Sequence, residues 1–170
     1  MIETQIKNSK CTNISKYKKR DKKETVSEYT ERIKKDSKHI FYDNYEYKGK
    51  KIVFDTTLNK YGMPVSFDHA TTNRNKKVKN GKFKIDLPDM ERLSKIHWLE
   101  EVFGGCLNCK DLIELPDPNN KDRISIICKE RLYFIVLEED KKQHVYNFIT
   151  AYPIDEEQYY KYLKRKKSPN

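Results

Sequence analysis

The sequence predicts an α+β domain, in which an N-terminal helix and hairpin precede a helix packed on an antiparallel sheet that ends in a three-stranded meander. Two observations carry this prediction. Helical periodicity occurs twice before residue 105, and three runs rich in β-branched and aromatic residues follow between residues 123 and 152. Because the strands are grouped rather than alternating with helices, the order is that of an α+β protein and not an α/β protein.

The first helix is expected over residues 25–38. Thr25 and Glu28 have the spacing of a capping box, in which each side chain bonds a backbone amide at the helix start. Apolar side chains then recur at Val26, Tyr29 and Ile33. Residues 1–24 are polar and Lys-rich, so we expect a flexible basic arm before the helix.

A β-hairpin is expected next, with strands at 39–47 and 51–57 around Lys48-Gly49-Lys50. Pro64 then precedes VSFDHATT, residues 65–72, which reads as a short strand or strand end.

The second helix is expected over residues 88–103. Pro88 suits its first position, and Asp89 complements the positive end of the helix dipole. Gly104-Gly105 predict its end. The expected apolar stripe is Met90, Leu93, Ile96, Leu99 and Phe103.

The last third predicts the meander. A Pro- and Asn-rich turn at 116–120 precedes it, and a helix at 155–165 follows it. The strands are expected at 123–129, 131–138 and 144–152. Residues 25–165 therefore form one domain, and residues 166–170 form a basic tail.

The net charge of +10 favours a polyanionic partner. The positive charge is concentrated at 16–23, 73–84 and 161–167, whereas the remainder of the chain is mildly acidic. No apolar run approaches the ~20 residues that span a bilayer, so no membrane partner is expected. Four cysteines without a secretory signal favour a reducing, cytoplasmic location.

His69 is the leading candidate for proton transfer, because an imidazole titrates near neutral pH. RNA carries its own nucleophile, the 2′-hydroxyl, so an enzyme that cleaves it needs only a proton-transfer group and donors for the phosphorane, and no metal. Thr71, Thr72 and Arg74 lie within five residues of His69. An ordinary surface histidine explains the same pattern.

The end of the last expected strand carries a polar pair, Thr150 and Tyr152. Strand alternation puts both on one face with Phe148, and Ile149 and Ala151 on the other. The pair suggests a site, although an edge position explains it equally well.

Two further groups favour a structural interpretation. His97 and Glu101 lie one helical turn apart and could simply pair. Cys106 and Cys109 form a single CxxC, and zinc would need two more ligands. The candidates for these are Cys11, His97 and Cys128. No metal or other cofactor is expected, and the chain has no phosphate-binding loop or dinucleotide motif.

From about residue 62 to 158, the order of these pieces resembles the barnase–EndoU–colicin–RelE-like (BECR) nuclease superfamily, in its phage- and mobile-element-associated branch. VSFDHATTNR resembles a family strand with a His-Ala segment, and ERLSKIHWLEEVF resembles a helix with Arg and Trp. LIELPDP resembles the segment after that helix. The run from Arg123 to Asp155 resembles the closing meander, which ends in a Thr-Ala-Tyr-type sequence.

The resemblance implies a metal-independent ribonuclease, a toxin or effector with a possible cognate protein inhibitor. It places His69, Arg92 and Thr150 at the active cleft, with Tyr152 and Arg123 nearby. Arg131 could supply a further cation.

The leading hypothesis is an endoribonuclease that leaves 2′,3′-cyclic phosphate on tRNA, mRNA or rRNA. The catalytic candidates are His69, Arg92, Thr150, Tyr152 and Thr72. The RNA-binding candidates are Arg74, Lys76, Lys77, Lys79, Lys82, Lys84, Arg123 and Arg131. Two alternatives stay open, a non-catalytic nucleic-acid-binding regulator and a phage or plasmid protein-interaction factor on the same fold.

Overall fold

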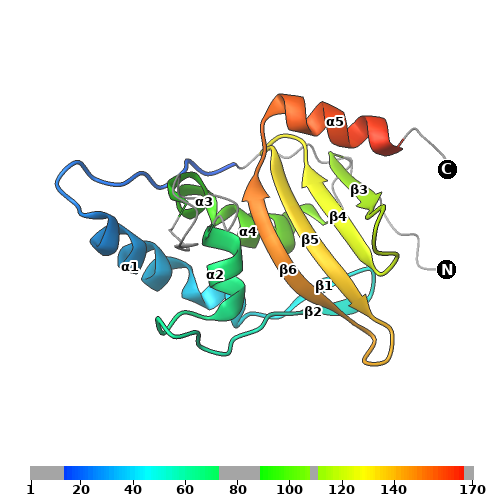
Figure 1. Ribbon diagram of the computed structural model, residues 1–170, viewed down its shortest axis with the longest axis horizontal. Helices are drawn as coiled ribbons and strands as arrows, with labels where there is room; N and C mark the ends of the chain where they lie inside the picture. The colour runs from blue at the N-terminus through cyan, green and yellow to red at the C-terminus, as the bar shows by residue number, and fades with distance from the viewer. Residues whose placement is uncertain (1–13, 73–88, 108–110, 167–170) are drawn as a thin grey trace, which may run out of the picture.

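The computed structural model describes residues 14–72, 89–107 and 111–166, and it confirms the α+β class (Figure 1). The helices are α1 Val26–Ser37, α2 Val65–Thr71, α3 Met90–Lys95, α4 Trp98–Glu101 and α5 Glu156–Lys166. Two short turns, the 3₁₀ turn η1 Lys38–Phe41 and the π-helical η2 Val102–Cys106, extend α1 and α4. The strands are β1 Tyr45–Tyr47, β2 Lys50–Val53, β3 Leu112–Pro116, β4 Arg123–Cys128, β5 Tyr133–Asp140 and β6 Val145–Pro153.

Helix α1 begins with the capping box that the sequence predicts. The Thr25 hydroxyl accepts from the Glu28 amide, and the Glu28 carboxylate accepts from the Thr25 amide at 2.7 Å. Tyr29 and Ile33 are buried on the face that packs into the core. The local signal and the tertiary packing therefore agree for this helix.

The expectation of a flexible arm is wrong for residues 14–24, which are held against the helices. The Lys18 amide donates to the Ser94 carbonyl at 2.7 Å, and the Trp98 indole donates to the Ser15 carbonyl at 2.8 Å. Because these bonds use backbone groups, the segment is fixed independently of its side-chain charges. Residues 1–13 lie outside the described residues.

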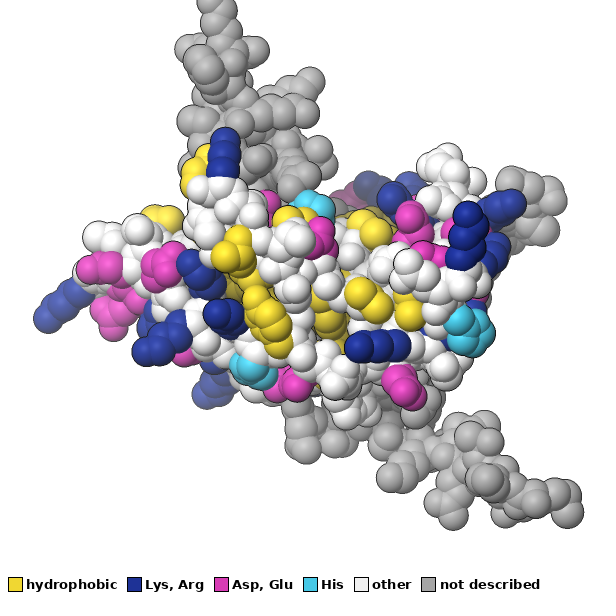
Figure 2. Space-filling view, turned by 90° about the horizontal axis from the view of Figure 1, so that it is seen from below, with side chains coloured by type: hydrophobic (Ala, Val, Ile, Leu, Met, Phe, Trp, Pro, Cys, Tyr) yellow, Lys and Arg dark blue, Asp and Glu magenta, His cyan; other side chains and the backbone are white. Residues whose placement is uncertain are grey.

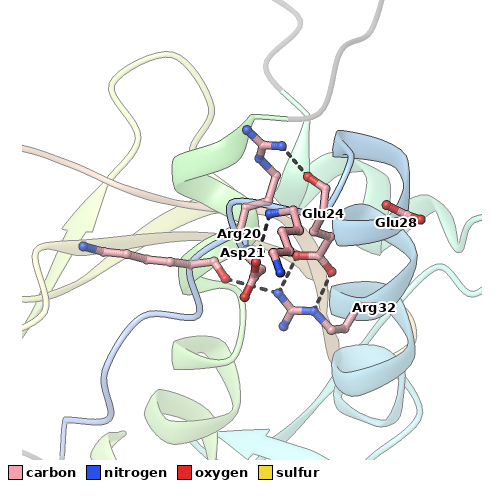
Figure 3. A pocket seen from close by; sticks show the side chains of 7 residues that line it. Arg20, Asp21, Glu24, Glu28 and Arg32 are labelled. Carbon is pink, nitrogen blue, oxygen red and sulfur yellow. Dashed lines mark hydrogen bonds and ion pairs between the residues drawn. The ribbon is translucent and has the colours of Figure 1, made fainter.

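An ion-pair cluster closes this segment onto the start of α1 (Figure 3). Arg32 donates to the Glu24 carboxylate through Nε and Nη2 at 2.8 and 2.9 Å, and Arg20 donates to the Glu24 carbonyl. The cations of this region are thus partly committed to neighbouring carboxylates.

The hairpin is confirmed, with a shorter first strand than expected. Lys48 and Gly49 have φ of 50° and 74°, the two positive values that a type I′ turn requires. Residues 38–41 form η1 instead of strand. Strand β2 then pairs in parallel with β6, so the sheet is mixed and not purely antiparallel as expected.

The sheet has the strand order β1-β2-β6-β5-β4-β3 and curls until its two edge strands meet. Tyr47 on β1 donates to the carboxylate of Glu114 on β3, and the Lys48 ammonium pairs with the same carboxylate at 2.7 Å. Polar side-chain contacts thus hold the two edge strands next to each other.

The two faces of the sheet are covered differently (Figure 1). Helices α1 to α4 pack on one face over the main core, which contains Phe67, Leu93, Leu99, Ile126 and Ile135. Helix α5 lies on the other face at one end of the sheet, over a smaller cluster. That cluster is Leu115, Ile127, Phe134, Ile154 and Tyr159. The remainder of this second face is where a ligand can reach the sheet.

Residues 65–72 were expected to form a strand, and this prediction is wrong because Val65–Thr71 is helix α2. Ser66, Phe67, Ala70 and Thr71 are buried, which is the spacing of one helical face. The β-branched and aromatic residues favoured a strand, but packing of this face against β6 overrides local propensity.

The helix expected over 88–103 is divided. The Asp89 carboxylate caps α3 by accepting from the Glu91 and Arg92 amides, and α4 follows a break at Ile96-His97. Pro88 lies outside the described residues. Gly104-Gly105 do not end the helix, because η2 continues through them to Cys106. Four of the stripe residues are buried, namely Leu93, Ile96, Leu99 and Phe103, whereas Met90 is exposed.

The meander and closing helix are confirmed, but β6 contains a bulge that alternation cannot predict. Val136 pairs with Thr150, whereas the next residue of β5, Leu137, pairs with Phe148. Ile149 is therefore an extra residue in β6. The bulge puts Phe148 in the main core and Thr150 on the opposite face, so the expectation that they share a face is wrong. Strand β3, at the sheet edge, was not predicted as a strand.

No helix in the described part of the chain combines the length and the apolar character needed to cross a membrane.

Tyr47→Phe tests the contact between the edge strands. Loss of the hydroxyl removes one hydrogen bond to a carboxylate, which contributes ~1.5–3 kcal/mol. We expect the free energy of unfolding to fall by about 2 kcal/mol in urea titrations. Tyr160→Phe, at a 59% exposed tyrosine of α5, is the control and should change nothing. Equal stability of both variants would contradict the closure of the sheet.

Candidate nucleic-acid interface

A pocket of about 690 Å³ opens on the second face of the sheet, between the β3–β4 loop, strands β4 to β6 and α5. Its walls carry hydroxyls from Ser125 and Thr150 and cationic side chains from Arg123, Lys164 and Arg165. The one carboxylate among its described lining residues is that of Asp117, which accepts from the Asn119 and Asn120 amides. The pocket therefore combines apolar walls with cations, as a phosphate-bearing ligand requires.

Three stacked aromatic rings form one wall of this pocket. The Phe134 ring on β5 stacks with Tyr152 on β6 and with Tyr162 on α5, at centroid distances of 5.1 and 4.6 Å. The interplanar angles of 30° and 27° are those of stacked rings. This aromatic cluster of Tyr152, Phe134 and Tyr162 joins the closing helix to the sheet.

A guanidinium lies over each of the two tyrosines of the aromatic cluster. Arg92 of α3 lies 4.7 Å from the Tyr152 ring centroid, and Arg165 of α5 lies 5.4 Å from that of Tyr162. Arg123 approaches from the sheet, where its Nε is paired with Glu138 at 2.6 Å. Of the three cations that line the pocket, Arg123 is thus paired, whereas Lys164 and Arg165 have no ion pair within the described ranges.

The five residues that sequence analysis selected for catalysis meet beside this pocket. The Thr150 hydroxyl donates to the His69 carbonyl at 2.8 Å, and Arg92 Nη1 donates to the Thr72 carbonyl at 3.1 Å. Arg92 in turn lies over Tyr152. The end of α2, the start of α3 and the end of β6 therefore converge on one point, although they are far apart in the sequence.

A backbone bond explains how α2 and α3 come together. The Asp89 amide at the start of α3 donates to the Thr71 carbonyl at the end of α2, at 2.8 Å. Strand β2 pairs with β6 only over residues 145–147, and α2 packs against β6. Helix α2 therefore brings its own carboxyl end, with His69, to the strand end that carries Thr150.

These contacts define what each group can do. Thr150 uses its proton on the His69 carbonyl, so it fixes the position of His69 and can still accept a hydrogen bond. Arg92 donates through Nη1 to the Thr72 carbonyl, whereas Nε and Nη2 have no hydrogen-bond partner within the described ranges. Burial, followed by a hydrogen bond to Tyr162, raises the pKa of Tyr152, so its hydroxyl stays protonated at neutral pH.

Arg131 was expected among the RNA-binding cations, and the structure instead places it inside the protein. Its side chain is 2% exposed and donates to the Glu101 carboxylate through Nε and Nη2 at 3.0 and 2.6 Å. Nη1 contacts the sulfur atoms of Cys106 and Cys128 at 3.4 and 3.6 Å. A guanidinium held in this way ties the β4–β5 turn to α4 and does not reach a ligand at the surface.

The described residues do not decide whether the cysteine candidates bind a metal ion. Cys109 lies outside the described residues, and so does Cys11. Within the described ranges, no three His, Cys, Asp or Glu side chains are grouped to hold a metal ion.

The cationic loop also lies outside the described residues. Its six expected RNA-binding residues are Arg74, Lys76, Lys77, Lys79, Lys82 and Lys84. Thr72, the last described residue before this loop, accepts a hydrogen bond from Arg92.

The face seen in Figure 2 carries charges of both signs among its described residues. Figure 2 shows the end of the molecule opposite α5, where apolar side chains lie among both Lys or Arg and Asp or Glu. The mixed charge on this face gives a polyanion no continuous positive track.

Comparison of the chain with protein-family models, with curated proteins and with solved structures gave no match. The resemblance to the BECR superfamily therefore stays a prediction.

Sequence reasoning missed Phe134, Tyr162 and Arg165. Tyr159, Tyr162 and Leu163 recur at helical spacing in the closing helix, and that stripe predicts a face packed on the sheet. Their partner on β5 depends on tertiary register and has no local signal.

The burial of His97 can be tested through the pH dependence of the protein's stability. Burial, partly opposed by the nearby charge of Glu101, lowers the pKa of His97, and the charges of Lys18 and Arg131 act in the same direction as burial. As the pH falls below about 6.5, the ordinary value, the unfolded chain binds a proton that the folded chain excludes. Stability therefore falls between pH 7.5 and pH 5.

His97→Gln should reduce this fall in urea titrations, because glutamine does not titrate. His144→Asn, at an exposed histidine with φ of 59°, is the matched control. Identical pH profiles for wild type and His97→Gln would show that His97 is not the group responsible.

Proposed function

We propose that this protein is a metal-independent endoribonuclease that binds RNA in the pocket beside α5. The observation that supports the proposal most is the convergence of His69, Thr72, Arg92, Thr150 and Tyr152 at one end of a cationic, aromatic-walled pocket. Three separate segments supply these residues, so local sequence does not account for their meeting.

In the proposed reaction, the 2′-oxygen forms a bond to phosphorus and the bond from phosphorus to the 5′-oxygen breaks. The 2′-hydroxyl loses its proton and the leaving 5′-oxygen gains one, and the products are a 2′,3′-cyclic phosphate and a 5′-hydroxyl. The His69 imidazole carries one of these protons as base or acid, and solvent water exchanges the other. Thr150 holds His69 in place through its carbonyl. No oxidant or metal is needed for this balance.

Arg92 would stabilise the phosphorane. Its Nη1 donates to the Thr72 carbonyl, and its guanidinium lies over the Tyr152 ring. These two contacts restrict the orientation of the N–H groups on the other two nitrogens. A preorganised guanidinium next to developing charge contributes ~10²–10³-fold to a rate. Tyr152, kept protonated by its raised pKa, is a further donor.

A non-catalytic RNA-binding regulator is the second candidate. The specific observation in its favour is that the described lining of the pocket includes no imidazole, because His69 reaches the pocket through its backbone bond to Thr150. Its carboxylate, on Asp117, is already engaged by two backbone amides. Such a regulator would bind RNA with the same residues and leave it intact.

The biological setting that accompanies the enzyme proposal is a cytoplasmic toxin or effector of a phage or mobile element, held in check by a protein inhibitor. A protein-interaction factor on the same fold would instead use its cations on an acidic protein. Co-purification of an acidic protein, with RNA neither bound nor cleaved, would favour that alternative.

Cleavage of RNA in EDTA tests the proposal. Wild-type protein should fragment tRNA or total RNA and leave cyclic phosphate ends, which are identified because phosphatase removes them only after acid has opened the ring. His69→Ala should slow cleavage ~10²–10⁴-fold, the usual contribution of a general acid or base.

His144→Asn is the matched control, since it removes an exposed histidine from the β5–β6 turn far along β6 from Thr150. Its rate should equal that of wild type. Intact RNA at high protein concentration would favour the binding-only regulator, and equal rates for His69→Ala and wild type would remove His69 from the mechanism.

A further inference from the structure

One row of side chains crosses the floor of the pocket from β3 to β6. Leu115 pairs with Ser125, Ser125 pairs with Val136, and Val136 pairs with Thr150. All four residues line the pocket, as expected for paired residues of neighbouring strands, which project from the same face of a sheet. Because neighbouring strands lie ~4.8 Å apart, Ser125 and Thr150 are about 9.6 Å apart, with Val136 between them.

The Ser125 hydroxyl has no partner inside the described part of the protein. The residue is only 8% exposed, and its hydroxyl makes no hydrogen bond within the described ranges. Buried polar groups of folded proteins are nearly always hydrogen-bonded, and a serine hydroxyl can donate one bond and accept two. A buried, unpaired hydroxyl that lines a pocket therefore indicates where a polar atom of a ligand binds.

The Thr150 hydroxyl offers the pocket a different hydrogen-bonding group. Its proton is donated to the His69 carbonyl at 2.8 Å, so toward the pocket its oxygen can only accept. The ligand atom next to Thr150 must therefore carry a proton, as the nitrogen of an amino group does. A carbonyl oxygen at the same place would leave both oxygens unpaired.

The surface between the two hydroxyls is apolar. Val136 lies between them, and Phe134 and Ile149 line the pocket beside it. A flat ring with apolar faces and polar edges fits this floor, because its face can lie over Val136 while its edges reach the hydroxyls. Lys164 and Arg165 line the same pocket and have no ion pair within the described ranges, so a phosphate attached to the ring would also meet positive charge.

From this row we propose that the pocket binds one unpaired, amino-bearing nucleobase over Val136, with its amino group donating to Thr150 and its other edge bonded to Ser125. The proposal rests on the proposed function and specifies its substrate, a single-stranded RNA in which cytosine is preferred to uracil. The two bases have rings of the same size, and cytosine carries an amino group where uracil carries a carbonyl oxygen. A paired base uses these edges on its partner strand and cannot present them to the pocket.

Binding of 2′-O-methyl RNA tests the proposal without cleavage, because this RNA lacks the nucleophilic hydroxyl. The affinities of single-stranded oligo-C and oligo-U dodecanucleotides are measured by fluorescence anisotropy at pH 7.5. Wild-type protein should bind oligo-C about tenfold more tightly, since uracil would leave the Thr150 oxygen unpaired. Oligo-C paired with oligo-inosine should bind more weakly than oligo-C alone.

Ser125→Ala should weaken the binding of oligo-C ~5-fold, the loss expected for one hydrogen bond. It should not lower the Tm of the free protein, because the hydroxyl has no partner within the described ranges. Ser27→Ala, at an exposed serine of α1 outside the pocket, is the matched control and should equal wild type in both measurements.

Thr150→Val keeps the shape of the side chain and removes the acceptor, so the preference for oligo-C over oligo-U should disappear. This variant also releases the His69 carbonyl, and its readout is therefore the ratio of the two affinities and not a cleavage rate.

The outcomes separate this proposal from the proposed function. If wild type binds oligo-C no more tightly than oligo-U while it cleaves RNA in EDTA, the base subsite is wrong and the nuclease stands. A lower Tm for Ser125→Ala would show that the protein itself uses this hydroxyl and would also overturn the subsite, as would equal binding of paired and unpaired oligo-C. If the base preference is as expected but RNA stays intact, the protein is the binding-only regulator and the subsite stands.

Discussion

The extra residue in β6 is the constraint on which the candidate site depends. Before the bulge, Phe148 points into the main core, and after it Thr150 and Tyr152 line the opposite face. Without Ile149 as an additional residue, strict alternation would keep Phe148, Thr150 and Tyr152 together. The bulge thus lets one strand fill the core with its first half and present polar groups to the pocket with its second half.

The curl of the sheet is the second feature on which the candidate site depends. Contact of Tyr47 and Lys48 with Glu114 joins the edge strands over the main core, where α1 to α4 pack. Helix α2 packs against the last part of β6, and this packing places the His69 carbonyl within hydrogen-bond distance of the Thr150 hydroxyl. Covering one face with four helices and the other with α5 alone leaves a pocket on the second face (Figure 1).

The features that depend on neighbouring residues in the chain were predicted correctly from the sequence. The capping box of Thr25 and Glu28, the turn at Lys48-Gly49 and the strands of the meander all follow from adjacent residues. Helix α2, the division of the second helix, the burial of Arg131 and the bulge depend on contacts between distant segments. The catalytic candidates were chosen for the chemistry of their side chains, and their convergence beside one pocket required β6, α2 and α3 to pack together. The aromatic cluster was missed because its three rings come from three elements.

The most direct test of the account is to map where RNA contacts the protein. Single-stranded 2′-O-methyl RNA carrying photoreactive uridines would be crosslinked to the full chain, and the modified residues identified by mass spectrometry. We predict crosslinks at Tyr152 and Tyr162 on the walls of the pocket. Crosslinks confined to residues 14–24 or to the hairpin, with none on the aromatic cluster, would contradict the assignment of this face as the RNA-binding surface.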